Sequence, residues 1–199
     1  MMRAVMALLV LAGCAELQRP RVIEAPPPGL LTVSADPVAS ALAATSQAFA
    51  DQGSQLRGRP SEAARAAAQL EYLIAVAPGA VPLSRAAEIA LLAARGELRA
   101  ALGVPEAADA RPVVASLNMA AGALERGDAA AATRALAPVG GAETLRRLGD
   151  VGALPNAEQA TILFSRELAR NAAELRADQA QDLGGQRSDL LTEGLGRGF

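Results

Sequence analysis

The sequence predicts an all-α protein, an irregular bundle of about six to seven helices that forms a single domain. Two observations support this fold class. Alanine, the residue with the highest helix propensity, makes up about a quarter of the 199 residues. Apolar residues recur at three- and four-residue spacing over several stretches, and proline or glycine separates one stretch from the next. These patterns divide the chain into an apolar leader (1–13), a proline-rich tether (14–33), an alanine-rich helical domain (34–183) and a flexible glycine-rich tail (184–199).

The leader carries one positive charge, Arg3, before an apolar run from Ala4 to Ala12. This run is shorter than the about 20 residues that span a bilayer, and it is typical of the core of a secretory signal peptide. The motif Leu11-Ala12-Gly13-Cys14 resembles the lipobox of bacterial lipoproteins. The resemblance covers only this amino-terminal stretch. It implies that the chain is cut before Cys14 and that fatty acids such as palmitate are attached to this cysteine. The alternative is a buried helix with one cysteine in the core.

Cys14 is the only cysteine in the sequence, so the expected lipidation would use the single thiol. Two or more acyl chains hold a protein firmly in a membrane, whereas one chain holds it only marginally. We therefore expect a covalent lipid at Cys14 to join the protein to the membrane. Ala15 and Glu16 follow the cysteine. An aspartate there marks inner-membrane retention in many lipoproteins, so its absence favours the outer membrane, facing the periplasm. The inner membrane is the alternative.

The tether is predicted from its prolines. Pro20 and the run Pro26-Pro27-Pro28-Gly29 do not suit a helix or a central strand, and they favour extended polyproline geometry. We expect such a segment to hold the folded part of the chain away from the lipid surface.

The helical domain is predicted to begin with one helix that starts near Ser34 or Asp36 and continues to Leu56, since Asp36 can cap it and Pro37 suits its first position. Its apolar residues recur every seven residues. The second helix, over residues 61–77, has the clearest apolar stripe in the chain, and Pro78-Gly79 ends it.

The third helix, over residues 82–102, has a broad apolar face to which Ile89 and Leu92 contribute. Such a face predicts a central position in the bundle. Gly96 lies within this helix and indicates a break or a close approach to a neighbour. Tyr72 on the second helix is expected at the edge of the core, with its hydroxyl group in water.

The remaining helices are shorter until the last one. A fourth helix starts at Pro112, and Gly127-Asp128 joins it to a fifth. A brief helix that contains Leu148 follows between glycines. The longest helix is expected over residues 157–183, with Asn156 as its N-cap in a capping box.

Composition argues against several classes of activity. The sequence has no histidine, which removes the commonest metal ligand and the side chain that most readily transfers protons near neutral pH. All 19 basic residues are arginine, against 21 acidic residues, so there is no lysine base for serine hydrolysis and no basic field for nucleic acid. Glu167 and Glu174 form a carboxylate pair of the kind that is common on solvated helix faces. We therefore expect no enzyme activity, metal, cofactor or nucleic-acid partner.

Two functions are favoured. The first is a lipid-anchored envelope protein whose helical domain is a non-enzymatic binding or scaffold module for another envelope protein. The alternative is an accessory subunit of an envelope transport or assembly system that binds a small apolar or lipid ligand. A contiguous exposed apolar patch would favour the first, and a cavity lined by leucine and valine rather than alanine would favour the second. An enzyme ranks third, and it would need a cleft of acidic side chains around a trapped water.

Overall fold

The computed structural model describes residues 25–31 and 35–195 of the chain, with side chains described as far as Gln181. Within these ranges the chain is helical and has no strand, so the all-α prediction is confirmed. The signal peptide, Cys14 and residues 14–24 of the tether lie outside the described ranges. In chain order the elements are α2 (Pro37–Ala48), the 3-10 helix η2 (Ala50–Leu56), α3 (Pro60–Ala80), α4 (Arg85–Leu102), α5 (Ala110–Glu125), α6 (Ala129–Leu136), the 3-10 turn η3 (Ala137–Val139), α7 (Ala142–Leu148) and α8 (Pro155–Leu195).

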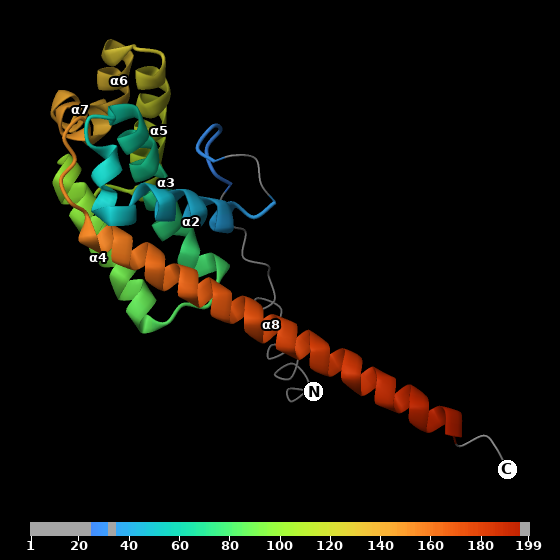
Figure 1. The fold of residues 1–199 in the computed structure, drawn as a ribbon. Helices are drawn as coiled ribbons and strands as arrows, with labels where there is room; N and C mark the ends of the chain where they lie inside the picture. The colour runs from blue at the N-terminus through green and yellow to red at the C-terminus, as the bar shows by residue number, and fades with distance from the viewer. Residues whose placement is uncertain (1–24, 32–34, 196–199) are drawn as a thin grey trace, which may run out of the picture.

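The helix at the centre of the body is α3, which contacts α2, α4, α5, α7 and η2 (Figure 1). Most of its side chains are buried, including Leu70 and Leu73. Alanines occupy many of its buried positions, and their small side chains let the neighbouring helices approach closely. One hydrophobic cluster runs from Leu30 to Phe164, which is consistent with the prediction of a single domain.

The first helix ends earlier than predicted. The α-helix stops at Ala48, and Asp51, Gln52 and Gly53 adopt left-handed backbone angles, with φ of 50°, 58° and 74°. Such angles are unfavourable for residues other than glycine, so contacts from α8 and from the residue before it must hold the turn in place. The amide of Asp51 donates to the carboxylate of Glu158, and the amide of Leu154 donates to the carbonyl of Gln52.

The seven-residue apolar repeat nevertheless identified the buried side chains correctly. Leu42, Phe49 and Leu56 are all buried, although Phe49 follows the end of α2 and Leu56 lies in η2. The repeat therefore predicted which residues face the core. These residues reach the core because the chain turns after α2, and not because one helix continues to Leu56.

The central position predicted for the third helix is wrong. Ile89 and Leu92 on α4 are 53% and 60% exposed, so the additional apolar face points outward from the body. Helix α4 packs with α8 along the outside of α3. Gly96 marks neither a break nor a close approach, since α4 is continuous through it and a side chain there would meet nothing within 4 Å.

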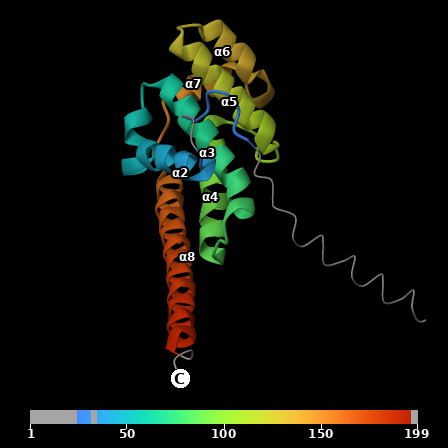
Figure 2. The same cartoon turned by 90° about the vertical axis from the view of Figure 1, so that its right-hand side faces the viewer.

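The linkage between α5 and α6 is as predicted. Gly127 has a positive φ of 75°, and Asp128 caps α6 by accepting a hydrogen bond from the amide of Ala131 at 2.8 Å. Helix α5 starts two residues before Pro112, at Ala110, and packs along α3. The pair α5 and α6, together with α7, forms the end of the body away from the free end of α8 (Figure 2).

Helix α8 differs from prediction at both ends. Asn156 is not the N-cap, because the helix starts at Pro155. The first turn is instead capped by Glu97 of α4, whose carboxylate accepts from the amides of Asn156 and Ala157 at 3.2 and 3.0 Å. The helix also continues to Leu195, so the boundary between the helical domain and a flexible tail at residue 184 is corrected.

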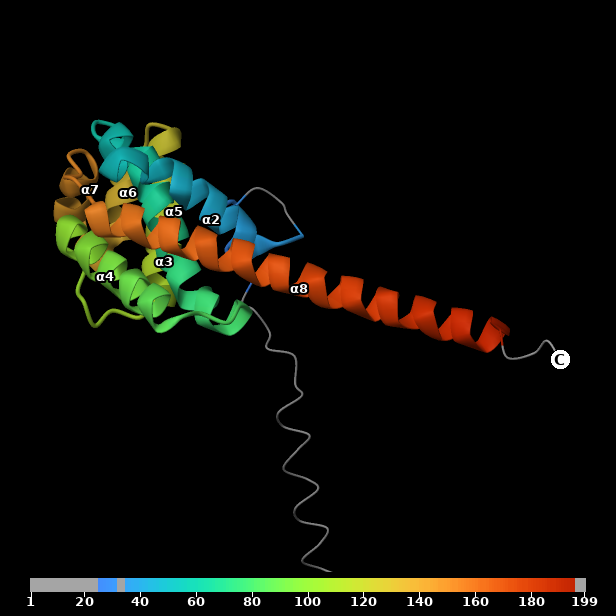
Figure 3. The ribbon, with the colours of Figure 1, turned by 60° about the horizontal axis from the view of Figure 1, so that its bottom comes forward.

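The extension passes through Gly184 and Gly185. A glycine inside a helix costs about 1 kcal/mol relative to alanine, and the glutamine, leucine and arginine residues around this pair favour the helix. The first part of α8 lies between α2 and α4 (Figure 3). Beyond Ala172 the helix leaves the body, and the side chains of residues 173–181 are exposed (Figure 1).

The described part of the tether is not a free spacer. Residues 25–31, which we call the strap, pack on the body near α3 and α5, and Leu30 is only 1% exposed. Three side chains of the body donate to carbonyl groups of the strap: Gln69 to Leu30 at 2.9 Å, Asn118 to Pro28 at 3.1 Å, and Arg65 to Gly29. The tether of residues 14–33 is therefore corrected, because its second half belongs to the folded domain.

Candidate functional site

Cys14, the one site residue predicted from the sequence, lies outside the described residues, and its lipidation stays a prediction. Within the described part of the chain, no helix combines the length and the apolar character needed to cross a membrane. The same residues hold no group of three or more His, Cys, Asp or Glu side chains that is arranged to bind a metal ion. The sites to consider are therefore the ionic clusters and the pockets.

The most buried ionic group joins α3 to α4. Glu71 is 0% exposed, and its two carboxylate oxygens accept from Nε and Nη2 of Arg99 at 2.6 and 2.8 Å. This forked geometry is the strongest form of arginine–carboxylate pairing. Arg95, one helical turn before Arg99, brings its Nε to within 3.3 Å of the same carboxylate.

Arg99 also ties down the loop between α4 and α5. Its Nη1 donates to the carbonyl groups of Glu106 and Ala108 at 2.7 Å each. The hydrogen bonds that Arg99 donates to Glu71 raise the pKa of Arg99. Desolvation lowers the pKa of Arg95, and the charge of Glu71 opposes this shift. Glu71 and Arg99 hold each other and the backbone, so we interpret the group as structural.

The carboxylate pair considered in the sequence does not form a catalytic site. Glu167 is buried against α4 rather than solvated as expected, and it accepts from the hydroxyl of Ser84 at 2.6 Å and pairs with Arg170. Glu174 is exposed and lies 3.8 Å from Nε of Arg170. These contacts place Glu167 at the start of α4, where Ser84 is the N-cap, and leave Glu174 on the surface.

A third ionic group lies on the exposed side of α7. Glu143 accepts from Nη2 and Nε of Arg146 at 2.7 and 2.9 Å and from Nε of Arg147 at 2.6 Å. The hydrogen bond from Arg146, followed by that from Arg147, lowers the pKa of Glu143 to about 2. Arg147 also donates to the carbonyl of Ala100 at 3.1 Å, so the group fastens α7 to the end of α4.

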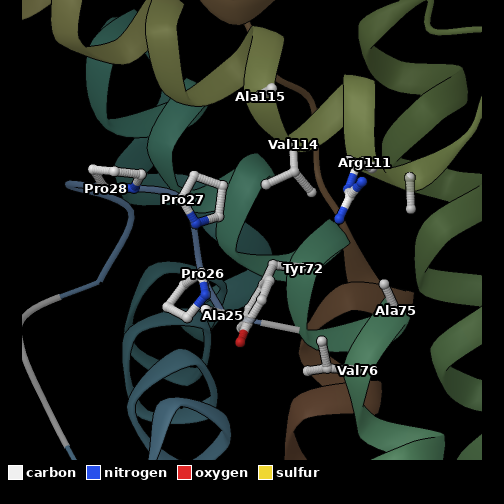
Figure 4. Close-up of a pocket in the computed structure, with 11 residues that line it drawn as sticks. Ala25, Pro26, Pro27, Pro28, Tyr72, Ala75, Val76, Arg111, Val114 and Ala115 are labelled. Atoms are coloured by element: carbon white, nitrogen blue, oxygen red, sulfur yellow. The ribbon is translucent and has the colours of Figure 1, made fainter. Parts of the chain in front are cut away.

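An apolar pocket of about 320 Å³ lies between the strap and helices α3 and α5 (Figure 4). This volume is near the lower end of the range for small-molecule sites, about 300–1,000 Å³. The lining side chains are mostly proline, alanine and valine, with one aromatic ring and one guanidinium group. They are Ala25, Pro26, Pro27, Pro28, Tyr72, Ala75, Val76, Ala110, Arg111, Val114 and Ala115.

Two lining residues carry polar groups. Tyr72 is only 4% exposed, so its predicted place at the edge of the core is corrected, because the strap covers it. Its ring lies beside Pro26, and its hydroxyl points away from Val114 (Figure 4). Arg111, in the first turn of α5, is the one charged side chain in this lining, and it points from α5 toward α3.

Two further surface features are present. A pocket of about 330 Å³ between α2, η2 and α3 is lined largely by polar side chains, among them Gln47, Gln55 and Gln69. On α4, the exposed Leu92 borders a smaller apolar pocket of about 150 Å³, which Ile74 and Pro78 also line. Of these features and the strap pocket, the strap pocket combines an apolar interior with a single cation.

Sequence reasoning missed the strap pocket because one of its walls is the segment assigned to the tether. A signal was present, since Pro28-Gly29 suits the two central positions of a type II turn. Gly29 has a φ of 75°, and the amide of Leu30 donates to the carbonyl of Pro27 at 3.1 Å, which closes that turn. Comparison with protein-family models, with curated proteins and with solved structures gave no match for this chain.

Proposed function

We propose that this chain is a lipid-anchored protein of the bacterial cell envelope, held at Cys14 in the outer membrane and facing the periplasm. Its helical domain acts as a non-enzymatic binding or scaffold module for another envelope protein. The lipobox supports the anchor. The observation that carries the binding role is the free part of α8, which we call the arm and define as residues 173–195.

The arm has the features of a protein-binding helix. Its described side chains, residues 173–181, are exposed, and Leu175 among them is 63% exposed. Over 23 residues (195 − 172) a helix spans roughly 34 Å. Isolated helices gain little stability in water, and most helices in proteins depend on packing against a partner. A helix that leaves its own domain in this way is well placed to pack against another protein.

The charge of the arm indicates the chemistry of the partner. Residues 173–195 contain five acidic side chains and two basic ones, a net charge of −3. The acidic residues are Glu174, Asp178, Asp182, Asp189 and Glu193, and the basic residues are Arg176 and Arg187. Two copies of such a helix would repel each other, so we infer a partner with a basic surface around an apolar strip that receives Leu175.

The anchor is tested with Cys14→Ser in the full-length chain. We expect the wild-type protein to incorporate radioactive fatty acid and to sediment with membranes, and the variant to do neither. Leu175→Ser, which leaves the lipobox intact, is the control and should be labelled like the wild type. A Cys14→Ser protein that is still labelled would show that the anchor is elsewhere.

The binding role is tested by photo-crosslinking in cells. A photoreactive phenylalanine analogue at position 175 should give a crosslinked protein, while the same analogue at the exposed position 130 of α6 should give none. The double change Asp178→Arg and Asp182→Arg should remove the crosslink if the partner surface is basic. An arm that gives no crosslink, or one whose crosslink is unaffected by charge reversal, would contradict the proposal.

The strap pocket favours a second candidate, an accessory subunit of an envelope transport or assembly system that binds a small apolar or lipid ligand. The pocket has the volume and the apolar walls that such ligands need. Its lining has four alanines and no leucine, so it lacks the leucine and valine walls named above as the sign of this candidate, and the support comes from its volume and apolar character alone.

A further inference from the structure

The strap pocket is held open by fixed contacts. The strap forms one wall, and its carbonyl groups at Pro28, Gly29 and Leu30 accept hydrogen bonds from side chains of α3 and α5. Leu30 is inserted into the core beside this wall. Because the wall is attached at several points, the pocket is preformed and a ligand need not order the strap on binding.

The walls suit a hydrocarbon chain better than a peptide. Proline has no amide hydrogen, so Pro26, Pro27 and Pro28 offer no backbone donor to a ligand. The carbonyl groups of Pro27 and Pro28 already accept from Leu30 and Asn118. Backbone groups of α3, and those of α5 beyond its first turn, bond within their own helices. A peptide in the pocket would lose its hydrogen bonds to water with few replacements, whereas a hydrocarbon chain needs none.

Arg111 adds a cation to this apolar site. It lines the pocket from the first turn of α5, and its side chain is exposed enough to meet an ionic head group that stays near water. Arginine has five N–H donors in a planar fork that matches a carboxylate, so it can bind an anion while it keeps another contact. An apolar pocket with one guanidinium group at its side is complementary to an apolar chain with one negative end.

We propose that the strap pocket binds a free fatty acid, with the hydrocarbon chain between the strap, Tyr72 and Val114 and the carboxylate at Arg111. This inference deepens the second candidate function and rests on it, and it is independent of the anchor at Cys14 and of the arm. It assigns the ligand as a single-chain carboxylate, in preference to a neutral lipid or a diacyl phospholipid.

The test uses the full-length chain in phosphatidylcholine vesicles and a palmitic acid that carries a diazirine group. Illumination should crosslink the probe to peptides that contain Tyr72–Val76 and Val114–Ala115, and unlabelled palmitate should compete. Ala115→Phe places a ring in the pocket and should abolish the labelling. Ala130→Phe, an exposed alanine of α6, is the matched control and should label like the wild type. Circular dichroism checks that each variant is folded.

The role of Arg111 is tested separately. Arg111→Gln should raise the palmitate concentration for half-maximal competition by about tenfold or more, the loss expected for one charge-assisted hydrogen bond. Arg134→Gln, on the exposed side of α6, should leave it unchanged. An unchanged value in Arg111→Gln would overturn the carboxylate assignment.

Other outcomes would overturn the proposal as a whole. These are labelling that survives Ala115→Phe, stronger labelling by a diazirine phosphatidic acid, or labelling seen only in Cys14→Ser, which would show that the protein's own lipid fills the pocket. Equal labelling of wild type and Cys14→Ser is the expected result. A failed anchor would leave the pocket labelling intact, and a failed pocket would leave fatty acid incorporation at Cys14 intact.

Discussion

At the scale of single residues, the stability of the body depends on the carboxylate of Glu71, which lies close to two arginines. Glu71 balances the charge of Arg99 and lies beside Arg95, while Arg99 holds the loop that leads into α5. A buried ion pair costs free energy to desolvate, and loss of one partner leaves the other charge buried without compensation. Because Glu71 is the shared counter-charge of these arginines, we expect the stability of the domain to depend strongly on this one side chain of α3.

We expect Glu71→Gln to lower the free energy of unfolding by about 3–5 kcal/mol, because the guanidinium of Arg99 would lose its counter-charge in the core. Urea denaturation followed by circular dichroism measures this loss. The control is Glu62→Gln on the same helix, whose partner Arg59 is more than half exposed, and which should change stability by less than about 1 kcal/mol. Equal effects of the two substitutions would show that the buried pair has no special role.

The fork of arginines around Glu143 predicts a pH dependence. The folded pKa of about 2 lies below the ordinary value of 4.5, so this carboxylate stabilises the folded state above about pH 4.5 and loses that contribution as the pH falls toward 2. A carboxyl-carbon NMR titration should place the midpoint of Glu143 near 2. Arg146→Gln should move the midpoint toward 4.5, and Arg134→Gln should not. A wild-type midpoint near 4.5 would mean that the fork does not persist in solution.

At the scale of single elements, α8 is one continuous helix with two halves that differ in packing. Its first half is buried through Ala157, Ala160 and Phe164 between α2 and α4, and its start is capped by Glu97 of another helix. In its second half, the side chains that the structure describes, residues 173–181, are exposed. The alanine, leucine, glutamine and arginine residues of that half favour a helix without contact with the body, so the length of α8 is not set by the core.

This division predicts that the arm can be removed without loss of the fold. A chain that ends at Ala172 should keep its free energy of unfolding to within about 0.5 kcal/mol, since the side chains described beyond that point are exposed. Phe164→Ala, in the packed half, should cost about 3–5 kcal/mol. Urea denaturation measures both. Strong destabilisation by the truncation would show that the arm folds back on the body.

At the scale of the whole molecule, the strap decides where the domain begins. The proline run was interpreted as a spacer, but Leu30 enters the core, and α3 and α5 hold the carbonyl groups around it. The folded unit therefore starts at least nine residues before residue 34, where the helical domain was predicted to begin (34 − 25). The strap also forms one wall of the pocket, so the docking of residues 25–31 determines both the start of the domain and the shape of the pocket.

We expect Leu30→Ala to destabilise the whole domain by about 2–5 kcal/mol, the usual cost of removing a buried leucine side chain. A leucine in a free tether would have no such effect. Leu175→Ala on the exposed arm is the matched control and should change the free energy of unfolding by less than about 0.5 kcal/mol. Thermal unfolding of both proteins, at several urea concentrations, distinguishes a docked strap from a spacer.

Local patterns predicted the helices well and their positions poorly. Apolar periodicity found the stripe of α3 and the buried positions of Leu42, Phe49 and Leu56. It misplaced α4, because Ile89 and Leu92 are as apolar as core residues. Their exposure follows from the position of α4 on the outside of the body, which the local sequence does not show. The left-handed turn after α2 depends on Glu158, 107 residues away, and no local signal encodes such a contact.

The candidate site was harder to predict for a related reason. Every wall of the strap pocket comes from a segment whose role could be assigned locally: a proline run, a tyrosine beside a stripe and the first turn of a helix. Their meeting follows from hydrogen bonds of Gln69 and Asn118 across the body. The sequence did not indicate whether a cavity exists, and the pocket lies at the surface of the bundle, between the strap and helices α3 and α5.

The docked strap also limits the distance between the body and Cys14. With Ala25 fixed on the body, only the ten residues 15–24 separate it from Cys14, and even a fully stretched chain of that length reaches about 35 Å. A lipid on that cysteine would confine the body to a thin layer beside the bilayer, where fatty acids are most concentrated.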